Sequence, residues 1–113
     1  MPKFLFVYRG RPMPKAPSPE EMQAALNMWG DWIGKFMTSG EILDGGDGLK
    51  ETGKVVRGAG VVTDGPFMEA KEILGGYSIV QVPGYDRAIA IAAECPAVMF
   101  GGNVEIRELA GYM

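Results

Sequence analysis

The sequence predicts an α+β fold, a ferredoxin-like sandwich in which two helices cover one face of an antiparallel sheet. Short runs rich in β-branched and aromatic residues alternate with two amphipathic stretches. These elements follow one another as strand, helix, strand pair, strand, helix and strand, the order of a split β-α-β unit. With 113 residues, of which 47% are hydrophobic, the chain fits a single globular domain over residues 1–113.

The first half of the chain carries one strand and one long helix. The apolar run at residues 4–8 is too short for a helix and predicts a strand. A helix is expected to begin after Ser18, with Pro19 in its first position and Glu21 closing a capping box, and to end at Gly40. Apolar residues at spacings of three and four predict the helix face that packs on the core. They are Met22, Leu26, Trp29, Ile33 and Phe36.

The second half is expected to supply the remaining elements. A glycine-rich loop is followed by a strand pair, and Asp64-Gly65-Pro66 has the composition of a turn. The predicted elements are strands at 54–57, 60–63, 77–82 and 104–109, and a helix over 85–95 that ends before Pro96.

The sheet is expected to carry apolar side chains on both faces. Alternation along residues 4–8 and 77–82 points large apolar groups in both directions. Two helices cover only one face, and soluble monomers usually avoid a large exposed apolar patch. We therefore expect a homodimer, packed sheet against sheet, that encloses a pocket.

Composition excludes several classes of function. A net charge of -3 argues against direct nucleic-acid binding, and no apolar run is long enough to span a membrane. Cys95 is the sole cysteine, so no internal disulfide can form, and we expect it to be a small buried residue in a cytoplasmic protein. Histidine is absent, which removes His-based catalysis and His-ligated metals. We expect no metal and no cofactor.

One motif resembles a known family. Residues 63–67, Thr-Asp-Gly-Pro-Phe, followed by Gly75-Gly76-Tyr77, are similar to the signature of the DGPF branch of the YCII-related proteins. The similarity extends to the helix start at 18–21 and to the closing residues 104–107. The resemblance implies a dimeric α/β barrel with a candidate active site in the cleft beneath the sheet.

The resemblance also bears on function. In the YCII group the site is a His-Asp pair, and a few relatives act on small ring compounds as lyases or isomerases. Many DGPF proteins are encoded beside alternative sigma factors, which implies a sigma factor as a candidate partner. Because this chain has no histidine, only the aspartate, Asp64, carries over.

Asp64 and Lys71 are the charged candidates. In an apolar pocket, desolvation would raise the pKa of Asp64 and make it a usable general acid or base. Alternatively, its side chain bonds the backbone of the Gly-Pro-Phe bend. Lys71 either balances that charge and holds an anionic ligand, or forms a surface ion pair.

Three residues on the strands are candidate binding groups. Tyr8 and Tyr77 either point a hydroxyl into the pocket or belong to the core. Arg9, at the end of the first strand, either reaches a carboxylate of the ligand or lies in water. With Asp64 moving a proton, and Lys71 or a tyrosine orienting the molecule, the resemblance implies a cofactor-independent lyase or isomerase acting on a small organic molecule. The alternative is a non-catalytic ligand-binding or regulatory module associated with a sigma factor.

Overall fold

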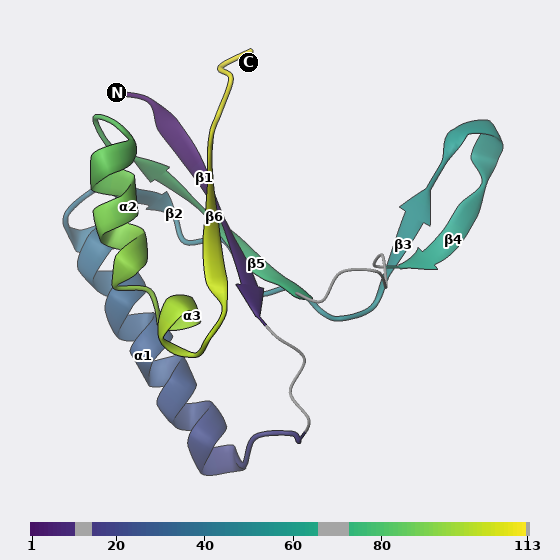
Figure 1. The fold of residues 1–113 in the computed structure, drawn as a ribbon, viewed down its shortest axis with the longest axis horizontal. Coiled ribbons are helices and arrows are strands. Elements are labelled where there is room, and N and C mark those ends of the chain that lie inside the picture. Colours follow the sequence, from purple (N-terminus) through teal and green to yellow (C-terminus); the bar gives the residue numbers. More distant parts are fainter. Residues whose placement is uncertain (11–14, 66–72, 113) are drawn as a thin grey trace.

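The computed structural model describes residues 1–10, 15–65 and 73–112. Its elements are β1 (Lys3–Gly10), α1 (Pro19–Thr38), β2 (Ile42–Asp44), β3 (Gly53–Val56), β4 (Val62–Gly65), β5 (Ile73–Gln81), α2 (Tyr85–Ala93), α3 (Pro96–Met99) and β6 (Asn103–Glu108). Four strands form an antiparallel sheet in the order β2-β5-β1-β6, and β3 and β4 form a separate two-stranded sheet. In Figure 1 the helices lie to the left of the four-stranded sheet, and the β3–β4 hairpin reaches away to the right. The fold is therefore α+β with an open antiparallel sheet, and it has the predicted helices on one face.

The core lies between that sheet and the helices. Alternation along β1 buries Phe4, Phe6 and Tyr8 toward the helices, while the residues between them remain partly exposed. Trp32 and Phe36 of α1 meet these side chains, and their rings pack edge to face with centroids 5.9 Å apart. The indole N–H of Trp32 donates to the main-chain oxygen of Ile91 on α2, at 3.1 Å. One sheet face is thus closed by aromatic packing.

The start of α1 is as predicted, but its buried face is shifted. Ser18 accepts from the main-chain N–H of Glu21, and the Glu21 carboxylate accepts from the N–H of Ser18, which completes the capping box. Phe36 is buried, whereas Met22 and Leu26 of the predicted core stripe are 48% and 57% exposed. The prediction of core packing was wrong for these two residues, because the first half of α1 borders a cavity.

The sheet contains a strand that the sequence analysis missed. Ile42 of β2 is buried and pairs with Val80 of β5, so β2 supplies the edge strand next to β5. The strand pair predicted at 54–57 and 60–63 does exist, displaced by one or two residues, but it forms the hairpin and not part of this sheet. We call this hairpin, residues 53–65, the arm.

The predicted turn at Asp64-Gly65-Pro66 is only partly visible. Asp64 and Gly65 lie within β4, where they pair with Lys54 and Gly53 of β3, so the turn prediction was wrong for them. Pro66 lies outside the described residues. The two strands of the arm are joined at residues 58–60 by a short 3₁₀ turn, with Ala59 at a φ of 62°.

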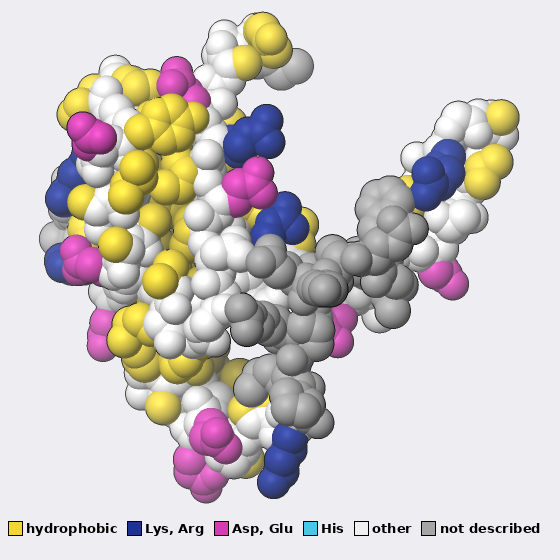
Figure 2. Space-filling view, viewed as in Figure 1, with side chains coloured by type: hydrophobic (Ala, Val, Ile, Leu, Met, Phe, Trp, Pro, Cys, Tyr) yellow, Lys and Arg dark blue, Asp and Glu magenta, His cyan; other side chains and the backbone are white. Residues whose placement is uncertain are grey.

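None of the helices in the described part of the chain covers the second face of the four-stranded sheet (Figure 1). At its centre Leu5 lies opposite Ile79, and Val7 lies opposite Tyr77. We call these four residues the bare face; each is partly or largely exposed. In Figure 2, blue and magenta side chains lie along the right-hand border of the body, on the side from which the arm projects. Within the described ranges, no helix is both long and apolar enough to cross a lipid bilayer.

Candidate functional site

A cavity of about 780 Å³ lies beside the first half of α1. One wall is the apolar stripe of that helix, and the other walls are the loop after β2 and the ends of β1 and β5. The helix contributes Met22, Ala25, Leu26, Trp29 and Ile33. Phe100, after α3, adds a further aromatic ring. The cavity is therefore mostly apolar, and its rim is built from loops.

Glycines allow the loop after β2 to lie directly against β5. Gly46 has a φ of 67°, and a Cβ atom there would come within 1.8 Å of the Tyr77 carbonyl oxygen. A Cβ atom on Gly76 would come within 2.8 Å of the Asp47 carbonyl oxygen. Since no larger residue fits such distances without backbone movement, these glycines set the shape of the rim.

Tyr8 borders the cavity and carries a buried hydroxyl. Its hydroxyl donates to Ser78 Oγ at 2.7 Å, and the Ser78 hydroxyl donates to the main-chain oxygen of Gly45, also at 2.7 Å. Burial raises the pKa of the Tyr8 phenol above its ordinary value. Tyr8 therefore stays protonated at neutral pH and serves as a hydrogen-bonding group, not as a base.

Arg9 and Tyr77 also border the cavity, although both side chains have other surroundings. The Arg9 guanidinium donates to Glu105 on β6 at 3.1 Å and so lowers the pKa of that carboxyl. Tyr77 belongs to the bare face and is 37% exposed. Three of the predicted site residues, Tyr8, Arg9 and Tyr77, therefore meet around one cavity.

Asp64 lies elsewhere. It is on the arm, its side chain is 88% exposed, and it forms an ion pair with Lys54 across the hairpin. It is not among the residues that border the cavity within one copy of the chain. Lys71 lies outside the described residues.

A family model for the YCII-related domain matches residues 21–110. The chain belongs to this family. A comparison with curated proteins found no match. The matched range of the YCII-related domain covers α1, the sheet from β2 onward and the arm, so it includes most of the cavity wall.

Sequence reasoning missed the helix wall of this YCII-related domain. A stripe at helical spacing predicts a core-facing helix, and the same stripe serves as the lining of a cavity. The sequence feature that could have indicated the cavity is the pair of glycine doublets at 45–46 and 75–76. Such glycines indicate that two backbone segments lie close together, as they do at the rim of the cavity. Among the side chains that can be placed, no three Cys, Asp or Glu gather as metal ligands would.

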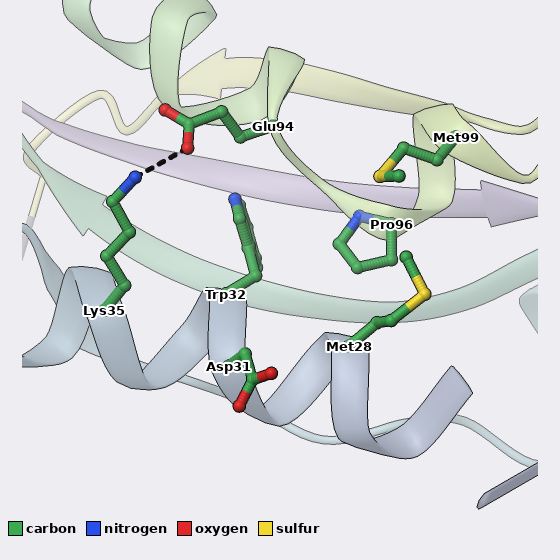
Figure 3. Close-up of a pocket in the computed structure, with 7 residues that line it drawn as sticks. All are labelled: Met28, Asp31, Trp32, Lys35, Glu94, Pro96 and Met99. Carbon is green, nitrogen blue, oxygen red and sulfur yellow. Dashed lines mark hydrogen bonds and ion pairs between the residues drawn. The ribbon is translucent and has the colours of Figure 1, made fainter. Parts of the chain in front are cut away.

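A second hollow lies between α1 and the α2–α3 segment (Figure 3). It has a volume of about 270 Å³ and is lined by Met28, Trp32 and Met99, among others. Lys35 and Glu94 at its edge pair with each other at 2.7 Å. Because the volume of this hollow is small, we take the larger cavity as the candidate site of the YCII-related domain.

Proposed function

We propose that this YCII-related domain binds a small, largely apolar organic molecule in the cavity beside α1. The volume of about 780 Å³ carries the proposal, because sites for small molecules usually enclose about 300–1,000 Å³. Such sites combine apolar walls with a few placed polar groups. Here the apolar walls come from α1, and the polar residues on the border include Tyr8, whose hydroxyl donates to Ser78, and Arg9.

The surroundings of the cavity indicate the chemistry of the ligand. The rings of Trp29 and Tyr8 pack edge to face, 4.9 Å apart, and favour a flat aromatic or ring compound. The carboxylate of Glu21 accepts from the N–H of Ser18, and Asp47 accepts from the N–H of Gly48, so both acids have local partners. We therefore expect a ring compound with one polar end.

A matched pair of substitutions tests the binding site. Ala25 borders the cavity, whereas its neighbour Ala24 is exposed on the same helix and does not. Ala25→Trp should fill the cavity and weaken binding of 2-naphthol, a neutral aromatic probe, at least tenfold by calorimetry. Ala24→Trp should leave the affinity unchanged. Wild-type protein that fails to bind the probe at millimolar concentration, or equal binding by both variants, would overturn the proposal.

The second proposal is acid–base catalysis by Asp64, as a cofactor-independent lyase or isomerase. Because Asp64 sits on the arm, this role requires the arm of a second copy to bring the carboxylate to a cavity. Asp64→Asn should then keep the affinity for the probe and abolish turnover of a ring substrate. Equal binding without turnover in wild type supports the alternative, a ligand-binding or regulatory module associated with a sigma factor.

The proposed assembly is a homodimer packed sheet against sheet, which would close the open sheet into an α/β barrel. The support is the bare face, whose apolar side chains no helix covers. Sedimentation at micromolar concentration tests it. A monomer under those conditions would contradict the proposal.

A further inference from the structure

The arm has no core of its own. Each of its strands has four residues, and none of residues 53–65 is buried. An isolated two-stranded hairpin is marginally stable at best in water, and three or more strands or a packed face are needed for stability. The arm is therefore expected to need contact with another protein surface in order to be stable.

One face of the arm is suited to such a surface. Val56 pairs with Val62, and Lys54 pairs with Asp64. Because directly opposed residues in an antiparallel pair share a face, and residues two apart share it as well, all four side chains point the same way. The two valines are 72% and 56% exposed. This face thus carries an apolar pair beside a pair of opposite charges.

The bare face of the sheet has the same pattern. Leu5 and Val7 of β1 lie opposite Arg107 and Glu105 of β6. Glu105 accepts from Arg9 at 3.1 Å and from Arg107 at 3.4 Å, so charges of alternating sign border the apolar centre. An arm laid on this face would place valines on apolar side chains, with Lys54 and Asp64 beside charges of both signs. Figure 1 shows the arm projecting on the side of the sheet that lacks helices.

The exposed area indicates that a second copy is the occupant. The chain exposes 8103 Å², whereas a compact monomer of 12.2 kDa exposes about 6,100 Å². The radius of gyration is 15.6 Å, against about 13 Å for a compact chain of this length. The excess of about 2,000 Å² exceeds the roughly 800 Å² that each partner of a standard interface buries.

We infer that the arm of each copy docks on the bare face of a second copy, with the face that carries Val56 and Val62 turned toward the partner's sheet. The exchange is reciprocal, as a two-fold axis requires. This inference rests on the proposed homodimer but changes its contact: the partner's arm, and not the partner's sheet, lies directly on the apolar centre of the bare face. The docked arm also moves Asp64 from water to the surface of the partner subunit.

Removal of the arm tests the inference directly. Gly53 and Gly65 are paired partners, so an Asn-Gly turn can replace residues 54–64 and close the hairpin without loss of register. We expect the dissociation constant measured by sedimentation to rise at least tenfold, while far-UV circular dichroism shows that the body remains folded. A dimer of unchanged affinity would overturn the role of the arm and leave the homodimer standing.

Cross-linking locates the arm. Val56→Cys in one tagged chain and Val7→Cys in another should give a mixed disulfide dimer on oxidation. Val56→Cys combined with Ile89→Cys, on the helix side and 55% exposed, is the matched control and should not. If the double variant Val7→Cys/Val56→Cys closes a disulfide within one chain at low concentration, the arm folds back on its own sheet and the exchange is wrong.

The outcomes separate the proposals. Monomeric protein throughout would remove both the homodimer and the arm exchange. Binding of 2-naphthol by the Ala24→Trp and Ala25→Trp pair depends on the cavity of one chain, so it tests the binding function independently of the arm.

Discussion

The body and the arm are built from the same kind of antiparallel pairing but differ in what surrounds it. In the body, β1 and β5 pair over eight residues and bury Phe4, Phe6 and Val80 completely. In the arm, β3 and β4 pair over four residues and bury none. Since net stabilisation by each hydrogen bond is small, burial of side chains, and not strand pairing, is what stabilises the sheet of the body. The arm lacks this burial and therefore depends on another surface.

The largest expected effect compares two valines. Val80→Ala should lower the free energy of unfolding by about 2 kcal/mol, because it removes two buried methyl groups and leaves a cavity. Val62→Ala on the exposed arm should change it by less than about 0.5 kcal/mol in a monomeric sample. Urea denaturation measures both. Equal effects would mean that the arm is as well packed as the body.

The polar groups of the body offer the next contrast. Tyr8→Phe removes the donor to Ser78, and we expect a loss of about 1 kcal/mol in the free energy of unfolding. Tyr77→Phe, on the bare face, is the control and should cost less. A larger cost for Tyr77→Phe would contradict the assignment of Tyr8 as the buried group.

A surface ion pair of the body gives a pH-dependent effect. Arg87 donates to Glu41 at 2.6 and 2.9 Å and lowers the pKa of Glu41 to about 2. The folded pKa lies below the unfolded value, so this pair stabilises the protein above about pH 4.5 and the contribution is lost as pH falls toward 2. Glu41→Gln should flatten the pH dependence of the unfolding free energy in that window. An unchanged profile would show that the pair is not maintained in solution.

The smallest effect is expected on the arm itself. Lys54→Ala removes an exposed ion pair with Asp64, and such pairs contribute less than about 1 kcal/mol. The free energy of unfolding should shift by less than about 0.5 kcal/mol, while the dimer dissociation constant should rise several-fold. A clear drop in thermal stability of the monomer would place the pair in the folding of the body.

Much of the fold was predictable because its signals are local. The capping box at Ser18 and the apolar run at 4–8 fix the start of α1 and the strand β1 from a few adjacent residues. Cys95 is buried as expected, and burial raises the pKa of its thiol to about 11. The edge strand β2 escaped detection because three residues with one buried side chain show no periodicity.

The site was harder to predict, since its parts come together only in three dimensions. Tyr8 and Tyr77 lie 69 positions apart in the chain yet border one cavity through neighbouring strands. Trp29 and Leu26 recur at the spacing of a core-facing helix. That spacing does not show whether an apolar helix face packs against other side chains or lines a cavity. The position of Asp64 depends on the arm, and no property of its own sequence separates a strand of the main sheet from a strand of a projecting hairpin.

The root of the arm coincides with the rim of the cavity. Gly48 bridges to Gly76, and the N–H of Leu49 donates to the Gly75 carbonyl at 2.8 Å; the three glycines also border the cavity. The segment that leads into the arm is therefore fixed to the body at the same glycines that shape the cavity. A ligand in the cavity and a partner bound to the arm would act on the same backbone contacts, so each would change the affinity for the other by an equal factor if these contacts differ between the free and docked states.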